Sequence, residues 1–180
     1  VISGQPYPIL DDGVKLVKLP SLDLYSYNNP LKAFNFNLLK NKIDFYEWIS
    51  HLTGGFSEPY TFGERMAKWA KYNFSKYDVV HDNQTLAYGL LQLKNLGLPV
   101  VGTIHHPITM DKRIDIQHAE TLFLKILKWR WYSFLNMQMH VARQLDPIIV
   151  VSENTRKDLV RDFKVDIKKT RKVLHGIDHL

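Results

Sequence analysis

Polar side chains follow several short apolar runs of the chain, and histidines are prominent among them. His81, Asn83 and Gln84 lie at the end of one run, and His105 and His106 follow the next. An imidazole titrates near neutral pH and can bind a hydroxyl or transfer a proton, while a short amide can hold sugar hydroxyls. These residues are candidates for binding a polyhydroxylated or phosphorylated ligand. The alternatives are loop histidines bonded to backbone carbonyls and an Asn83 that caps the next helix.

Two other places could bind an anion. Ser152 and Glu153 open a predicted helix, whose free N–H groups attract negative charge, although a carboxylate there would repel a phosphate. Gly54 and Gly55 could let the backbone approach a phosphate closely. A plain helix cap and a plain turn are the alternative interpretations, because the glycine pair matches no known nucleotide-binding loop.

Metal and nucleophile chemistry find little support in the sequence. The best metal-binding candidates, His105, His106 and Asp111, are loosely spaced, so we expect no metal site. The chain has no cysteine, which removes disulfides, zinc thiolates and cysteine nucleophiles and fits a reducing compartment. No organic cofactor is indicated by any motif.

Composition is that of a folded domain with a basic balance. The 180 residues are 45% hydrophobic and 23% charged, with a formal net charge of +6. Such a charge suits anionic membranes and phosphate-bearing ligands, whereas nucleic acid is not expected because no binding motif accompanies it. A basic cluster at 164–172 is either a solvated face or a contact for acidic lipid. No apolar run approaches the roughly 18 residues of a membrane-spanning helix.

The spacing of apolar residues predicts alternating strands and helices. In the second half of the chain we expect strands at 77–81, 99–104, 147–151 and 171–175, and helices at 85–96, 118–145 and 152–163. In the first half we expect a strand at 14–19 and helices at 31–50 and 61–75, while loops are predicted at 51–60 and 105–117. This order is typical of parallel βαβ units, so the fold class is α/β, a Rossmann-like doubly wound parallel sheet with helices on both faces.

Parallel strands bring their carboxyl ends to one edge of the sheet, where open α/β folds bind ligands. The residues after the strands are therefore expected to meet in one crevice. The long helix at 118–145 raises a separate question, because the aromatic run at 129–132 winds around it and cannot all face a core. Packing against a second element and a patch for a membrane or partner are both open.

Four motifs occur in an order that resembles a known family. They are 77–81 (YDVVH), 97–105 (GLPVVGTIH), 149–159 (IVVSENTRKDL) and 173–178 (VLHGID), and 53–63 (TGGFSEPYTFG) is similar to a motif of one subgroup. Together they resemble the N-terminal, acceptor-side domain of GT-B fold, retaining glycosyltransferases of family 4.

The resemblance implies a domain at 1–175 whose first strand is missing, because 1–3 is similar to the end of the family's second strand, and an interdomain linker that starts at 176–180. It implies that His105 is the catalytic histidine near the transferred sugar. The expected substrate-binding residues are His81, Asn83, Gln84, His106, Gly54, Gly55, Ser152 and Glu153. Asn83 stands where many members have a second histidine, and His175 replaces an asparagine before the Gly-Ile-Asp turn.

The implied activity is transfer of a sugar, of the retaining hexosyltransferase type, from a nucleotide sugar to a sugar or lipid-linked acceptor. In this family the donor is held by a C-terminal domain, so the chain alone is expected to be inactive. The expected location is cytoplasmic, with peripheral attachment to a membrane. The alternative is a non-enzymatic, Rossmann-like binding module for a protein partner or an anionic membrane.

Overall fold

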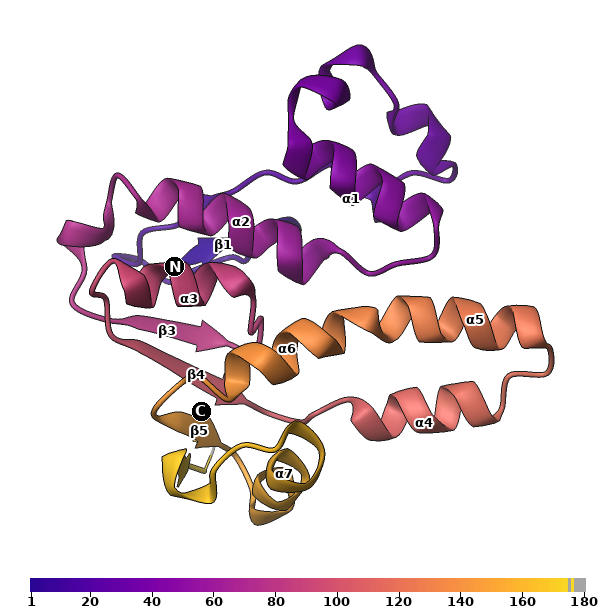
Figure 1. Ribbon diagram of the computed structural model, residues 1–180. Helices are drawn as coiled ribbons and strands as arrows, with labels where there is room; N and C mark the ends of the chain where they lie inside the picture. Colours follow the sequence, from indigo (N-terminus) through magenta and orange to yellow (C-terminus); the bar gives the residue numbers. More distant parts are fainter. Residues whose placement is uncertain (175, 177–180) are drawn as a thin grey trace.

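The computed structural model describes residues 1–174 and 176 and contains two parallel sheets (Figure 1). The smaller sheet pairs β1 with β2, and the larger has the order β3-β4-β5-β6. The strands are β1 (Ile2–Ser3), β2 (Val17–Lys18), β3 (Val80–Asn83), β4 (Val100–Ile104), β5 (Ile148–Val150) and β6 (Thr170–Lys172). The predicted α/β class with parallel strands is confirmed.

Side chains of the larger sheet alternate between two unlike faces. On β4, Val100, Gly102 and Ile104 are buried, and Ile148 and Val150 continue that face on β5. The opposite face carries the intervening residues, and those of β3 on that side are exposed. One face of the sheet is thus the core, and the other is more open.

The helices that follow the strands of the larger sheet cover the core face. They are α3 (Tyr88–Asn95), α6 (Leu135–Ala142) and α7 (Glu153–Asp158), which continues as a π turn (Leu159–Phe163), and α2 (Glu58–Ala70) packs on α3. Because the strand order advances steadily, right-handed crossovers place these helices on one side of the sheet. In the described part of the chain no helix covers the open face, whereas the sequence pattern predicted helices on both.

Helices α2 and α3 pack unusually close to each other. Gly63 of α2 and Gly89 of α3 meet at the crossing, and a Cβ added at Gly89 would lie far inside van der Waals contact with the Gly63 carbonyl oxygen. A Cβ at Gly63 would collide with Ala87 in the same way. Small residues at this crossing therefore allow α2 and α3 to pack closely over the core.

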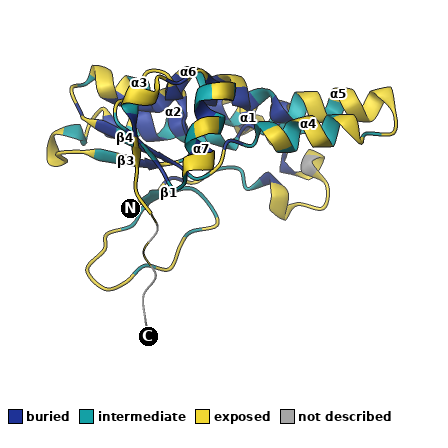
Figure 2. Ribbon diagram, turned by 90° about the horizontal axis from the view of Figure 1, so that it is seen from below, coloured by how far each residue is buried: buried dark blue, intermediate teal, exposed yellow. Residues whose placement is uncertain are grey.

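A helical pair projects beyond the ends of the strands. It consists of α4 (Thr109–Gln117) and α5 (Leu122–Trp131), and a 3-10 turn (Tyr132–Phe134) joins α5 to α6. Figure 1 shows both helices extending away from the sheet, and Figure 2 shows them mainly as exposed surface. The prediction of a loop at 105–117 is wrong beyond Ile108, and the predicted helix at 118–145 is divided into three segments.

The region before α2 is shaped by asparagines. Asn29, Asn35 and Asn41 each accept a hydrogen bond from the backbone N–H two residues further on, at 2.9, 2.9 and 3.1 Å. Such local bonds compete with a continuous helix. The predicted helix at 31–50 is therefore replaced in its first half by two 3-10 turns (Pro30–Ala33 and Phe36–Lys40), and α1 occupies Lys42–Leu52.

Several smaller boundaries also differ from the sequence pattern. The predicted strand at 14–19 is reduced to β2, the predicted helix at 61–75 starts earlier as α2, and β3 begins and ends later than 77–81. The remaining 3-10 turns are Leu24–Ser26, Phe74–Lys76 and Ile167–Lys169. Among the described residues, no helix is both long and apolar enough to cross a bilayer.

Candidate functional site

A polar cluster forms on the open face, where β3 and β4 end. The Nε2 atom of His105 lies 2.6 Å from Asn83 Oδ1, and the Nε2 atom of His81 lies 2.7 Å from Thr103 Oγ1. An amide oxygen can only accept, so Nε2 of His105 carries the hydrogen. His81, Asn83 and His105 thus lie on one face and at one edge of the sheet, as the strand-end argument predicts.

Gln84 holds the chain around this cluster. Its Oε1 accepts from the backbone N–H of His105 at 2.6 Å and of His106 at 3.3 Å, and its Nε2 donates to the His106 carbonyl at 2.7 Å. Gln84 and Leu86 both have positive φ, at 65° and 48°, and Gln138 of α6 donates to the Gln84 carbonyl at 3.3 Å. Left-handed backbone is uncommon outside glycine and clusters at functional sites. Gln84 therefore positions the loop that carries His105.

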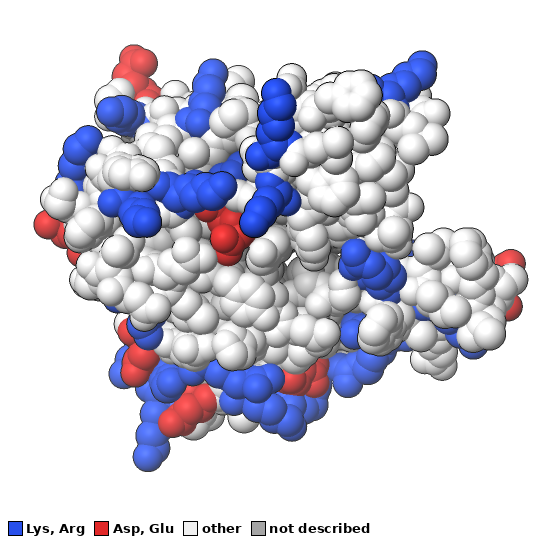
Figure 3. All heavy atoms as spheres, turned by 45° about the horizontal axis from the view of Figure 1, so that its top comes forward, with Lys and Arg blue, Asp and Glu red and all other residues white. Residues whose placement is uncertain are grey.

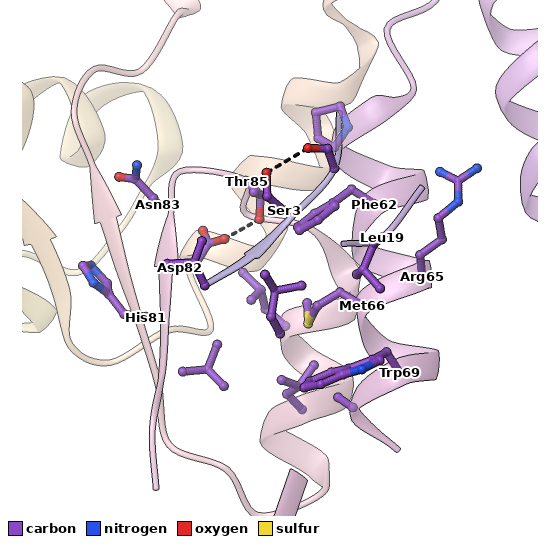
Figure 4. Close-up of a pocket in the computed structure, with 18 of the residues that line it drawn as sticks. Ser3, Leu19, Phe62, Arg65, Met66, Trp69, His81, Asp82, Asn83 and Thr85 are labelled. Atoms are coloured by element: carbon purple, nitrogen blue, oxygen red, sulfur yellow. Dashed lines mark hydrogen bonds between the residues drawn. The ribbon is translucent and has the colours of Figure 1, made fainter. Parts of the chain in front are cut away.

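Asp82, on the core face of β3, stabilises the turn that follows this strand. Its carboxylate accepts hydrogen bonds from the Thr85 hydroxyl and, at 3.0 Å, from the Leu86 N–H. Burial raises the pKa of Asp82, against the opposing effect of those two hydrogen bonds. In Figure 4, Asp82 points to the opposite side of β3 from His81 and Asn83. Asp82 thus fixes the turn and stays apart from the exposed cluster.

The start of α7 contributes a backbone tether. Thr155 donates to the His105 carbonyl at 2.9 Å, and Ser152 caps the helix by accepting from the Thr155 N–H at 3.0 Å. Glu153 is exposed, and its Oε2 atom lies 3.6 Å from Nη1 of Arg156. The geometry at Ser152 is that of a helix cap, the alternative stated above, and Ser152 contacts Thr155, which in turn binds the loop that bears His105.

His106 points to a different partner. Its Nε2 lies 2.9 Å from the carboxylate of Asp111 in α4, and both side chains are about half exposed. Within the described ranges, no three histidine, aspartate or glutamate side chains come together as a metal site. His106 and His105 therefore contact different partners after β4.

The glycine pair lies against the projecting helices instead of the strand-end cluster. Gly54 has a φ of 75°, and a Cβ there would lie 3.0 Å from Leu127, while a Cβ at Gly55 would collide with Arg130 and with Ser50. Arg130 itself donates to Ser50 at 3.0 Å. The two glycines thus allow the α1–α2 turn to fit against α5, and no described contact joins them to His105.

A cavity of about 1030 Å³ lies between the two sheets (Figure 4). Its sides include β1, β3 and apolar residues of α2 and α3, and its polar lining includes Glu58 and Arg65 as well as His81 and Asn83 of the strand-end cluster. Burial raises the pKa of Glu58 to about 7, with a further upward contribution from Glu47 and an opposing one from its own backbone and Arg65. Arg65 also pairs with the buried Glu47 at 2.6 Å.

A smaller cavity of about 220 Å³ opens between α1, α2, α3 and the start of α6. Tyr46, Tyr60 and Tyr88 line it, with ring centroids 5.0 Å apart for the first two and 6.4 Å for the last two. Arg130 and Asn136 add polar groups. Amphipathic rings beside hydrogen-bonding groups are suited to one sugar ring, whose apolar face packs on an aromatic side chain while its hydroxyls bond.

Sequence reasoning overlooked two residues that touch the cluster. Thr103 contacts His81 and Thr155 contacts the loop of His105, and both lie in motifs noted for other residues. Alternation along β4 could have identified Thr103, since it shares a face with the residue after the strand. His175 and the linker at 177–180 lie outside the described residues.

Comparison with known proteins identifies the family. A sequence model of glycosyltransferase family 4 matches residues 23–179, which is most of the chain. The chain belongs to this family, as the strand-end motifs indicated.

A relative with a described activity supports the same assignment. The chain is 42% identical over 179 residues to a protein of Mycolicibacterium hassiacum named MMP alpha-(1->4)-mannosyltransferase. The match covers 99% of this chain and 43% of that relative, so the chain spans less than half of the relative's length.

Proposed function

We propose that the chain is the acceptor-binding half of a retaining GT-B hexosyltransferase. The full protein would transfer a sugar, mannose in view of the relative's name, from a nucleotide sugar to a sugar or lipid-linked acceptor. The donor would be held by a second domain, so the chain alone would be inactive. No metal or organic cofactor is part of this proposal.

The observation that carries the proposal is the convergence of His81, Asn83 and His105 at the carboxyl ends of parallel strands, in a member of glycosyltransferase family 4. Open α/β sheets bind ligands at this edge. The cluster offers imidazole and amide groups, which can form hydrogen bonds with sugar hydroxyls.

In this proposal His105 touches the transferred sugar, and its neighbours position it. Asn83 fixes the imidazole through Nε2, while Gln84 and Thr155 fix the backbone on either side. Because His105 is already held in place, it loses little freedom when the substrates bind. The transferred sugar can then be held with its anomeric carbon against the acceptor hydroxyl at low entropic cost. Catalysis then comes from positioning and charge stabilisation and requires no protein nucleophile.

The tyrosine-lined cavity is the proposed place for one sugar unit of the acceptor. Tyr88 opens α3 four residues after Gln84, so the segment that leaves the strand-end cluster leads into the lining of this cavity. Replacing Tyr88 by alanine is expected to raise KM for the acceptor more than it lowers kcat.

The test uses the full-length protein with nucleotide-activated mannose and other nucleotide sugars, with mannose oligosaccharides as acceptors. We expect nucleotide release that depends on the acceptor, and a decrease in kcat of about 100-fold in His105→Ala. His118→Ala, at the exposed far end of α4, is the matched control and should retain activity. Absence of transfer from every nucleotide sugar would contradict the proposal.

The large cavity is better suited to a strand than to a substrate. β1 and β3 both line it, and among the described residues each is paired on one side only. We propose that a further strand of the full-length protein, the missing first strand of the domain at 1–175, lies between them. Hydrogen exchange tests this, because amides of β1 and β3 should be more protected in the full protein than in the 180-residue chain.

The proposed location is cytoplasmic, with peripheral attachment to a membrane. The cysteine-free sequence is suited to a reducing compartment. The projecting α4–α5 pair, with its exposed apolar side chains, supports attachment to a membrane.

A further inference from the structure

The α4–α5 pair exposes several large apolar side chains. Neither helix contains a buried residue among those described. On α5, the exposed fractions are 74% for Leu122, 67% for Phe123, 55% for Ile126 and 59% for Trp129. Contiguous exposed apolar side chains of this size usually mark a surface that binds something.

The four residues form a stripe along α5. Leu122, Ile126 and Trp129 are spaced by four and three residues, so they lie on one side of the helix, and Phe123 extends the stripe at its outer end. The other side of α5 is already used, because Trp131 stacks on Phe56 with centroids 4.8 Å apart. The side chains of the stripe therefore do not contribute to the packing of the core.

Basic side chains border the stripe. Lys125 has no acidic partner among the described residues, and Nζ of Lys128 lies 2.9 Å from Oδ2 of Asp115 in α4. From Thr109 to Trp131 there are five basic and three acidic side chains, and the chain as a whole has a net charge of +6. In Figure 3 the projecting part is covered mainly by uncharged side chains, with basic side chains near its base and acidic ones at its outer end.

An apolar stripe with tryptophan and a lysine border is the pattern of a helix that lies in the surface of a bilayer. The apolar side chains enter the acyl region while the lysines extend toward the headgroups. A purely apolar stripe would suit a second protein chain equally well, and the basic border favours an anionic surface.

We propose that the α4–α5 pair binds the full protein to membranes that contain anionic lipids, through Leu122, Phe123, Ile126 and Trp129. The pair projects past the carboxyl ends of the strands, so its surface is accessible beyond the sheet (Figure 1). This inference does not rest on the proposed function.

The experiment measures sedimentation of the full-length protein with vesicles of phosphatidylcholine, with and without phosphatidylglycerol. We expect binding to the anionic vesicles, weakened by salt, and a reduction of about tenfold or more in the double variant Leu122→Ser/Phe123→Ser. Phe36→Ser removes a side chain that is 79% exposed in another part of the surface and should bind like wild type.

A second measurement reports the depth of the helix. Tryptophan fluorescence should shift to the blue on binding and be quenched by brominated lipids, and Trp129→Phe should remove most of this quenching while the protein still sediments. Sugar transfer to a soluble acceptor should be unchanged in the Leu122→Ser/Phe123→Ser variant. This readout separates failure of membrane binding from failure of the proposed transferase activity.

Four results would overturn the inference. The first is equal sedimentation of wild type and the double variant, and the second is equal binding to vesicles with and without phosphatidylglycerol. The third is protection of 122–129 from hydrogen exchange without lipid, which would mean that another part of the protein covers the stripe. The fourth is a dimer, seen by light scattering and abolished in the double variant, which would mean that a second copy covers it.

Discussion

The helical pairs α2–α3 and α4–α5 illustrate two uses of apolar residues. In α2–α3, Leu90 and Leu93 are 1% and 2% exposed, and glycines bring the helix axes close. In α4–α5, Leu122 and Phe123 are 74% and 67% exposed, and the helices touch mainly each other. The first pair holds the fold together, while the second presents apolar surface outward.

The difference shows that apolar content alone does not identify a core. Side-chain burial contributes stability only where neighbouring elements exclude water, and α4 and α5 have few such neighbours. Changes in the first pair should therefore alter stability, whereas changes in the second should alter binding.

The largest expected effect is at the glycine crossing. Gly89→Ala introduces a Cβ that collides with the Gly63 backbone, so α2 and α3 must separate, and we expect unfolding to require about 3 kcal/mol less. Urea denaturation measures this change. Asn95→Ala, an exposed change on the same helix, should shift stability by less than about 0.5 kcal/mol. Equal stability of Gly89→Ala and wild type would mean that the helices are not packed this closely.

Asp82 tests the turn that joins the core to the site. Asp82→Ala leaves the Leu86 N–H and the Thr85 hydroxyl without their acceptor, and we expect a loss of about 2 kcal/mol in the free energy of unfolding. Asp82→Asn is the matched control, because an amide oxygen can still accept and the raised pKa shows that the buried charge itself is unfavourable. A larger loss in the asparagine variant would be inconsistent with this account.

Glu58, at the start of α2, gives the stability a pH dependence. Its pKa is raised from 4.5 to about 7, so the folded state binds more protons than the unfolded state between these values. This contribution to stability is therefore complete below pH 4.5 and is lost as the pH rises through about 7. The free energy of unfolding of wild type should therefore decrease between pH 4.5 and about 7. Because Glu58 is partly exposed, we expect Glu58→Gln to make this decrease smaller by about 1 kcal/mol.

Unfolding of wild type and Glu58→Gln at both ends of that pH range measures the effect. Glu120→Gln makes the same change on an exposed side chain between α4 and α5 and should follow wild type at every pH. Parallel curves for Glu58→Gln and wild type would show that the carboxyl is not buried in the full protein.

The same contrast explains what the sequence could predict. β4 and β5 were recognisable because buried parallel strands are continuous apolar runs, as 100–104 and 148–150 are. α4 was missed because an exposed helix needs no apolar stripe, and the 3-10 turns were missed because the asparagine bonds are local.

The candidate site could also be predicted only in part. The closeness of Asn83 and His105 follows from the parallel register, in which Asn83 pairs with Thr103. The use of both Gln84 amide atoms by the backbone does not follow from the register, because it depends on a positive φ at a residue that rarely adopts one. The packing of Gly55 against Arg130, 75 residues away, likewise depends on the tertiary fold.

The smallest expected effect on stability is at the tip of the projecting pair. Leu122→Ala removes a side chain that is already in water, so the free energy of unfolding should change by less than about 0.5 kcal/mol. Leu90→Ala makes the same change at a residue that is 1% exposed and should cost about 3 kcal/mol. Urea unfolding of both variants in the full protein measures the contrast directly. A loss of about 1 kcal/mol or more at Leu122 would show that the rest of the protein covers the stripe, and α4–α5 would then belong to a core like that of α2–α3.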